Sequence, residues 1–115
     1  MNENIQFYAH IIDPKDKRVN YWTLLPAAKR ITIEGFEDVI IFIHKGYNDA
    51  DMWVVAEGMT GLKMGEGQTK KEAIADFLDR AGRNDIGRSM LARMKQHGIS
   101  PWFKEYFKVA KGVKP

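Results

Sequence analysis

Residues 52–81, MWVVAEGMTGLKMGEGQTKKEAIADFLDRA, contain the pattern that decides the middle of the fold. Two β-favouring runs, 52–57 and 62–64, flank the residues Gly58–Gly61, which suit a short hairpin loop. Farther along, apolar residues recur at helical spacing and share one face: Ala73, Ile74, Phe77, Leu78 and Ala81. This pattern predicts a strand, a turn, a strand and then an amphipathic helix.

The ends of this helix are predicted from capping chemistry. Thr69 stands three residues before Glu72, as in a capping box. In that motif the Thr hydroxyl accepts the Glu backbone N–H, and the Glu carboxylate returns to the Thr backbone N–H. Gly82 is expected to end the helix, because glycine readily adopts the left-handed conformation after the last turn. A helix is therefore expected over 70–81.

Two strings in this stretch resemble a known pattern. W-x-V-x-E-x-x-T-G runs from Trp53 to Gly61, and G-x-T-x-x-E-A-I runs from Gly67 to Ile74. Together they resemble a hairpin followed by a capped helix in small proteins of phages, plasmids and other mobile elements, over about 30 of the 115 residues. Most of those proteins lack an assigned function. The resemblance implies an origin in a mobile element, and it supplies no catalytic positions.

The chain before the hairpin is expected to be mainly β. Residues 5–11 alternate between apolar and polar, and 19–25 and 30–34 are further β-favouring runs. The run Val39–Ile43 is apolar on both faces, which is typical of a central strand covered on each side. We therefore expect an antiparallel sheet of four or five strands over residues 5–66.

Two more helices are expected after the first. Asn84 or Asp85 can cap a helix over 86–97 that Gly98 ends, and Ser100-Pro101 can begin a third over 101–111. The second helix is expected to turn one apolar face to the core, formed by Ile86, Met90, Leu91 and Met94. The predicted fold class is α+β in a single domain, 1–115. Its β part, 5–66, precedes an α part, 69–112, whose three short helices pack on one face or end of the sheet.

Composition narrows the class of protein. Hydrophobic residues make up 44% and charged residues 29% of the 115, which is ordinary for one globular domain. The absence of cysteine excludes disulfides, thiol chemistry and cysteine-ligated zinc. The start of the chain lacks the features of a signal peptide, and the longest apolar run has five residues, against the ~20 of a membrane-spanning helix. We expect a cytoplasmic protein that does not act at a membrane.

Charge is distributed unevenly. Residues 1–60 hold six Lys/Arg and nine Asp/Glu, whereas residues 61–115 hold twelve and six. A basic face attracts nucleic acid or an acidic protein partner. The candidate residues for such a surface lie opposite the apolar stripes of the last two helices: Arg88, Lys95, Lys104, Lys108 and Lys111. The alternative interpretation is a solvated face that serves solubility.

Four aromatics, Trp102, Phe103, Tyr106 and Phe107, follow at helical spacing. Their spacing favours packing on the sheet, although so broad a stripe can extend into an interface, with Trp102 and Tyr106 as its candidate residues. Burial is predicted for Phe107, and likewise for Phe42 and Phe77 in their own patterns.

Residues that could support catalysis or bind metal are scattered. The histidines, at positions 10, 44 and 97, lie in three different elements and lack metal-ligand spacing, which leaves open only a site assembled in space. Asp49, Asp51 and Glu57 stand near Lys63, but Met59 occupies the lysine position of the familiar Asp, Glu-x-Lys nuclease arrangement. The expected role of these carboxylates is to solvate loops.

The function expected from the sequence is a small non-enzymatic binding protein without a cofactor. It would act through a protein–protein surface, for example as a modulator or inhibitor of a host complex, and a homo-oligomer stays open. The alternative is a nucleic-acid-binding accessory protein that uses the basic helices. A metal-dependent hydrolase is the third reading.

Overall fold

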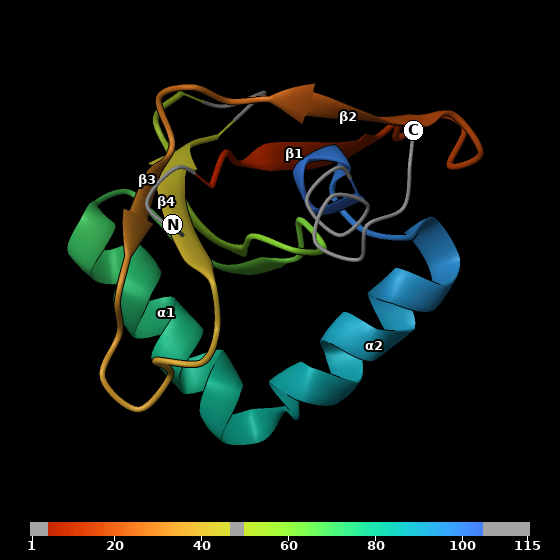
Figure 1. The fold of residues 1–115 in the computed structure, drawn as a ribbon. Coiled ribbons are helices and arrows are strands. Elements are labelled where there is room, and N and C mark those ends of the chain that lie inside the picture. The colour runs from red at the N-terminus through yellow and green to blue at the C-terminus, as the bar shows by residue number, and fades with distance from the viewer. Residues whose placement is uncertain (1–4, 47–49, 105–115) are drawn as a thin grey trace.

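The computed structural model describes residues 5–46 and 50–104, and Figure 1 shows how their helices and strands are arranged. In chain order the elements are β1 (Tyr8–Ile12), β2 (Asn20–Leu24), β3 (Lys29–Ile31), β4 (Ile41–Lys45), β5 (Trp53–Glu57), β6 (Lys63–Gly67), α1 (Lys70–Arg83) and α2 (Ile86–His97). A further helical turn begins at Pro101 and is described as far as Lys104. Within these residues, neither α1 nor α2 has the length and apolar character that a bilayer-spanning helix needs.

The strands form two antiparallel sheets. Strands β3, β4, β5 and β6 pair in that order, so the α+β fold with a four-stranded antiparallel sheet is confirmed. The hairpin β1–β2 forms a separate two-stranded sheet, which the sequence did not separate from the rest. This hairpin is held to the larger sheet through side chains: the Phe7 ring lies 5.2 Å from the Phe42 ring and 5.0 Å from the His44 ring.

Strand β4 is central and buried on both faces, as its continuous apolar run predicted. Ile41 and Ile43 face α1, and Phe42 faces the hairpin. Figure 1 shows the hairpin and α1 on opposite sides of the four-stranded sheet. Phe42 and Phe77 are 2% and 0% exposed, which confirms their predicted burial, whereas Phe107 lies outside the described residues.

Close approach of α1 to β6 depends on Gly65. A Cβ atom at this position would lie 2.6 Å from the carbonyl oxygen of Ala73 and 2.7 Å from the backbone nitrogen of Phe77. Such distances to backbone atoms leave no room for a side chain. Gly65 therefore allows close helix–sheet packing from a position within a strand.

The start of α1 follows the predicted cap with one difference. Thr69 Oγ1 accepts the Glu72 backbone N–H at 3.1 Å, so the N-cap is confirmed. The Glu72 carboxylate accepts the backbone N–H of Gln68 at 3.0 Å, one residue before the position expected of a capping box. The Thr69 hydroxyl and the Glu72 carboxylate thus each accept one backbone N–H at the start of α1.

The C-terminus of α1 differs from the prediction. The helix continues through Gly82 to Arg83, and Asn84 is the C-cap. The backbone N–H and the side-chain Nδ2 of Asn84 both donate to the Arg80 carbonyl, at 2.9 and 3.1 Å. Because these bonds satisfy the end of the helix two residues later, the expectation that Gly82 ends it is wrong.

The predicted caps of α2 are present, and of its predicted apolar face Ile86, Met90 and Met94 are half-buried, whereas the placement of Leu91 is wrong. Asp85 Oδ1 accepts the Arg88 N–H at 3.1 Å, and Gly98 follows the helix with φ 78°. None of the twelve residues of α2 is fully buried, and Leu91 is 52% exposed. The helix lies beside the hairpin, and its half-buried side combines Ile86, Met90 and Met94 with the polar residues Arg93 and His97. After α2, Phe103 packs with Phe7 and Phe42 on the sheet face opposite α1, so the helical segments are not confined to one face.

Candidate functional site

A cleft of about 410 Å³ runs between β1 and the face of the four-stranded sheet opposite α1. We call it the β1 cleft. Its apolar lining comes from the hairpin side and from β5, and includes Phe7, Ala9, Met52, Val54 and Ala56. Its polar lining consists of His10, His44, Lys63, Glu66 and Arg93. An apolar cleft with a few convergent polar groups is the usual form of a binding site.

Among the described residues no strand pairs with the second edge of β1, which the cleft follows and which Gly61 approaches at His10. The four consecutive residues 9–12 all line it, although side chains of a strand alternate between two faces. This is expected where a cavity follows the edge of a strand. Strand β2 pairs with the other edge of β1, and Leu25 N–H donates to Phe7 O at 3.0 Å. By the alternation of antiparallel pairing, the peptide groups of Tyr8, His10 and Ile12 therefore point away from β2.

One side of the cleft is shaped by the loop between β5 and β6. The Glu57 carboxylate is fully buried and accepts three hydrogen bonds: from Met59 N at 2.6 Å, from Thr60 N at 2.8 Å and from Thr60 Oγ1 at 2.6 Å. Burial raises the pKa of Glu57, and the hydrogen bonds from Thr60 and Met59 oppose that rise. Our expectation of a solvated loop carboxylate is wrong for Glu57, because the loop folds around it.

This loop explains why the E-x-x-T-G string has its spacing. Glu57 and Thr60 hold the turn, and Gly61 leaves it with φ 69°, in the region that favours glycine. A Cβ atom at Gly61 would lie 3.2 Å from the backbone nitrogen of His10 and 3.2 Å from Trp22 Cζ3. The string therefore builds a loop against which the hairpin packs.

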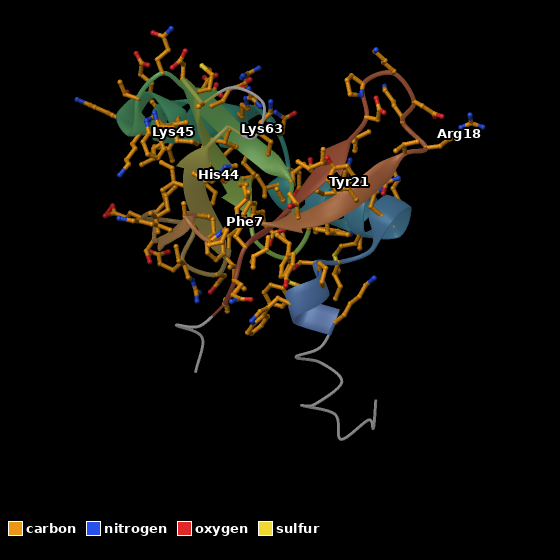
Figure 2. The ribbon with its side chains drawn as sticks, turned by 90° about the horizontal axis from the view of Figure 1, so that it is seen from above. Phe7, Arg18, Tyr21, His44, Lys45 and Lys63 are labelled. Atoms are coloured by element: carbon orange, nitrogen blue, oxygen red, sulfur yellow. The ribbon has the colours of Figure 1, made fainter. Side chains whose placement is uncertain are left out.

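His44 lies beside Phe7 at the base of the cleft, as Figure 2 shows. Its Nδ1 donates to the Lys45 carbonyl at 2.6 Å, which leaves the other ring nitrogen without a proton when the ring is neutral. Burial lowers the pKa of His44, and the bond to the carbonyl opposes this effect. In Figure 2, Arg18 lies at the tip of the hairpin, far from His44.

At the end of the cleft nearest α2, a chain of hydrogen bonds fixes His10. Asn20 Nδ2 donates to the Arg18 carbonyl at 3.2 Å, which turns Asn20 Oδ1 toward His10 Nε2, 3.0 Å away. His10 Nε2 therefore carries the ring proton. His10 Nδ1 then accepts from Arg93 Nη2 at 3.2 Å. These bonds hold His10 in one neutral tautomer.

Surrounding groups also keep His10 neutral. Burial lowers the pKa of His10, the bond to Asn20 acts in the opposite sense, and His97 and Arg93 lower the pKa further. The His97 ring lies 4.4 Å from the His10 ring. A proton on Nδ1 would break the bond from Arg93 and place two cations in contact. The bridge between the hairpin and α2 is therefore compatible only with neutral His10.

Arg93 is the least satisfied polar group of the site. Its Nε is buried and has no hydrogen-bond partner, and among the described residues no carboxylate pairs with its guanidinium. Burial lowers the pKa of Arg93 from its ordinary value, but a guanidinium remains charged in proteins. A second cavity, of about 740 Å³, is also lined by Arg93, together with Asp13, Lys17 and His97. Arg93 thus stands where the two cavities meet.

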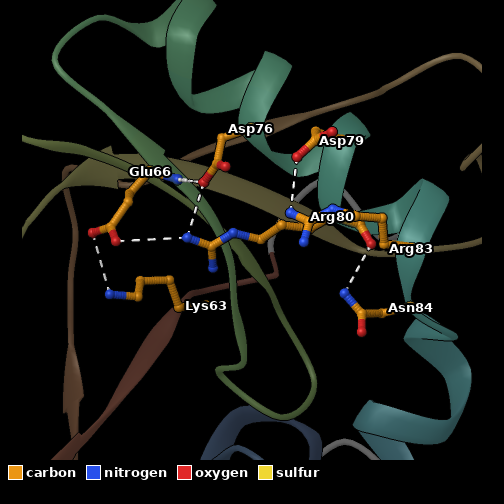
Figure 3. Close-up of polar contacts among 7 residues, drawn as sticks. All are labelled: Lys63, Glu66, Asp76, Asp79, Arg80, Arg83 and Asn84. Atoms are coloured by element: carbon orange, nitrogen blue, oxygen red, sulfur yellow. Dashed lines mark hydrogen bonds and ion pairs between the residues drawn. The ribbon is translucent and has the colours of Figure 1, made fainter.

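The other charges in the wall of the β1 cleft are paired. Lys63 Nζ lies 3.2 Å from Glu66 Oε1, and Arg80 Nη2 lies 3.6 Å from Glu66 Oε2. Figure 3 shows this network. Arg80 also contacts Asp76 at 3.0 Å, and Asp76 accepts the Glu66 backbone N–H at 2.9 Å. This network neutralises the β6 side of the cleft. Among the described side chains that line the cleft, Arg93 is the cation without a carboxylate partner.

The residues predicted from the basic pattern are only partly described. Arg88, Lys95 and Lys104 are exposed, and none has a carboxylate partner among the described residues. Lys108, Lys111 and Tyr106 lie outside the described residues. Trp102 is half-buried and packs at 4.9 Å against buried Phe103, which is the core placement that the spacing favoured.

Histidines that are distant in the chain do come together. The rings of His10 and His97 are in contact at a tilt of 49°, and His10 and His44 line the same cleft. Within residues 5–46 and 50–104, however, no three His, Asp or Glu side chains are placed to hold a metal ion. Glu57 is occupied by loop donors and Lys63 by Glu66, so the considered nuclease arrangement is not assembled from them.

Sequence reasoning missed Arg93. Its signal was present, because Ile86, Met90, Arg93 and His97 follow each other at intervals of four, three and four residues and so share a helix face. Comparison with known proteins adds nothing to this site: neither a protein-family model, nor a curated protein, nor a solved structure matches the chain.

Proposed function

We propose that this protein is a non-enzymatic binding protein that holds an extended segment of a partner protein in the β1 cleft. The observation that carries the proposal is the cleft along the free edge of β1. An extended peptide can add to such an edge through main-chain hydrogen bonds, while adjacent apolar surface accepts alternate side chains. The cleft volume, about 410 Å³, falls in the range of ligand sites.

The chemistry of the ionisable groups supports binding rather than catalysis. Glu57, His10 and His44 have displaced pKa values, and each is engaged in hydrogen bonds that hold the fold. A displaced pKa is a marker of catalysis only where the group is free to act on a substrate. The resemblance of the hairpin and α1 to mobile-element proteins makes a host protein the expected class of partner.

Strand addition is tested by a matched pair of proline variants. Ile12→Pro removes an N–H from the edge of β1 that lines the cleft, and Leu24→Pro removes one from the outer edge of β2 in the same hairpin. Ten-residue peptides are selected from a random display library on the wild-type protein, and their affinities for both variants are measured. We expect Ile12→Pro to weaken binding at least tenfold and Leu24→Pro to leave it unchanged.

Hydrogen exchange provides the second readout. A peptide bound as a strand should slow exchange of the Tyr8 and Ile12 amides and leave the outward amides of β2 unaffected. Peptides that bind Ile12→Pro as tightly as the wild type, or that protect only β2, would exclude strand addition at β1.

A second candidate function is nucleic-acid binding, favoured by the exposed cations Arg88, Lys95 and Lys104, which have no carboxylate partner in the part of the chain that the structure describes. It is tested with a 20-base-pair duplex over a salt series, comparing a triple glutamine variant at these positions with a control triple variant at Lys15, Lys29 and Lys71. We expect weak binding that is lost at physiological salt. Sub-micromolar affinity at about 150 mM salt, lost in the first variant alone, would promote this function, because non-specific binding there is typically ~10⁻⁴ to 10⁻⁶ M.

A further inference from the structure

Arg93 offers hydrogen-bond donors that the described fold does not use. A guanidinium has five N–H donors, and His10 Nδ1 accepts from the Nη2 of this one. Its Nε is buried without a partner. An unpartnered polar group at a buried position destabilises the folded protein, so such groups are normally satisfied in the working state.

The charge balance around Arg93 defines the missing partner. Glu66 is shared between Lys63 and Arg80, and the bond from Arg93 keeps His10 neutral. Within the described lining of the β1 cleft one positive charge therefore remains, and in the adjoining cavity Asp13 and Lys17 carry opposite charges. A monoanion would balance the charge of Arg93, whereas a phosphate dianion would leave an excess negative charge beside an apolar lining, where burying it is costly.

The shape of the group points to a planar anion. A guanidinium presents two parallel N–H groups that match the two oxygens of one carboxylate, and this bidentate contact is strong and directional. The site opens on the β1 cleft, whose lining beyond Arg93 is largely apolar. A ligand that matches both the guanidinium and the apolar lining is a carboxylate attached to an apolar or extended chain.

We propose that Arg93 binds a carboxylate group of the polypeptide that docks along β1, either an acidic side chain or the C-terminal carboxylate. This inference rests on the proposed function for its polypeptide, and on the unpartnered guanidinium for its chemistry. Arg93 sets which segments dock, because a segment without a carboxylate at this point leaves the half-buried guanidinium without a balancing charge.

Small probes test the anion site apart from the polypeptide. Butyrate, butyramide and inorganic phosphate are titrated into ¹⁵N-labelled protein, and the Arg93 Nε–H signal is followed by NMR. We expect butyrate to shift this signal saturably and butyramide not to shift it. Arg93→Gln should abolish the response of the His10 ring signals to butyrate, and Arg93→Lys, which keeps the charge without the fork, should weaken binding at least tenfold. Arg88→Gln, on the outer face of the same helix, should bind as the wild type does.

Three results would overturn the carboxylate assignment: equal shifts with butyramide, phosphate binding tenfold tighter than butyrate, or equal loss in Arg88→Gln. Thermal melts of the Arg93 variants show whether each is folded. Should Arg93→Gln fail to fold, the Arg93→Lys titration and the wild-type comparison of butyrate with butyramide still decide the matter.

The display-selected peptides separate this inference from the proposed function. Each peptide is made with a free and with an amidated C-terminus, and with internal acidic residues replaced by their amides. Loss on amidation assigns the terminal carboxylate, and loss on an internal replacement assigns a side chain. Peptides that protect β1 yet bind Arg93→Gln unchanged would overturn the carboxylate site and leave strand addition standing. If butyrate binds at Arg93 but no selected peptide protects β1, strand addition is overturned and the carboxylate site stands. Butyrate should bind Ile12→Pro as it binds the wild type, because this variant changes the strand edge and keeps Arg93.

Discussion

Replacing the buried carboxylate of Glu57 by its amide tests how the loop beside the cleft is held. Glu57→Gln keeps the shape of the side chain and removes its charge. Glu57 Oε1 accepts two bonds from Thr60, and Oε2 accepts one from Met59. An amide has one oxygen. If that oxygen takes the place of Oε1, the amide NH₂ group takes the place of Oε2. Two hydrogen-bond donors, this NH₂ group and the Met59 N–H, then face each other without an acceptor.

The magnitude follows from these bonds. Leaving the Met59 N–H without an acceptor costs about 1–3 kcal/mol, and each of the two remaining bonds loses about 1 kcal/mol when its acceptor becomes neutral. Relief from burying a charge offsets part of this, so we expect a loss of about 2–4 kcal/mol. For a domain of this size that lowers the melting temperature by roughly 10–25 °C.

Urea and thermal unfolding at pH 7.5, followed by circular dichroism, measure the loss. Glu34→Gln, at an exposed glutamate, is the control and should change stability by less than about 0.5 kcal/mol. Exchange of the Met59 and Thr60 amides should accelerate only in Glu57→Gln. If Glu57→Gln is as stable as the wild type, the carboxyl is already protonated at this pH, and the account of three bonds donated to a carboxylate is refuted.

Three further predictions use the same unfolding assays. Gly65→Ala should destabilise by about 1–3 kcal/mol or more, because its methyl group would meet the backbone of α1 and not a movable side chain; a neutral effect would contradict the close helix–sheet contact. Thr69→Ala should cost about 0.5–2 kcal/mol through loss of the N-cap, whereas Lys104→Ala should have almost no effect, and equal effects would mean that the cap does not hold α1. Burial lowers the pKa values of His10 and His44, so as the pH falls the unfolded chain takes up protons before the folded chain does. The contribution of these residues to the free energy of unfolding should be fully present above about pH 6.5 and should decline as the pH falls below that value. A double variant with glutamine at both positions should show a flatter decline than the wild type, and an identical profile would contradict this cause.

Local chemistry in the sequence was sufficient for most elements of the fold. The N-caps at Thr69 and Asp85 depend on residues a few positions away. The central position of β4 follows from a run that is apolar on both faces. The predicted end of α1 at Gly82 was wrong because Asn84 satisfies the Arg80 carbonyl with two bonds, a competition that spacing does not reveal. Capping and periodicity act within a few residues, so a sequence states them directly.

The candidate site required the tertiary structure. Arg93 and His10 are 83 residues apart, and their bond depends on how the hairpin crosses the sheet and where α2 lies beside it. The sequence indicated a solvated carboxylate at Glu57, whereas in the tertiary structure the loop closes around this side chain and buries it. The sequence determined which residues could form strands, caps and apolar faces. The docking of the hairpin decided which edge of β1 borders a cleft and which cation lacks a partner, because side-chain packing between distant segments sets the relative placement of elements and local spacing does not.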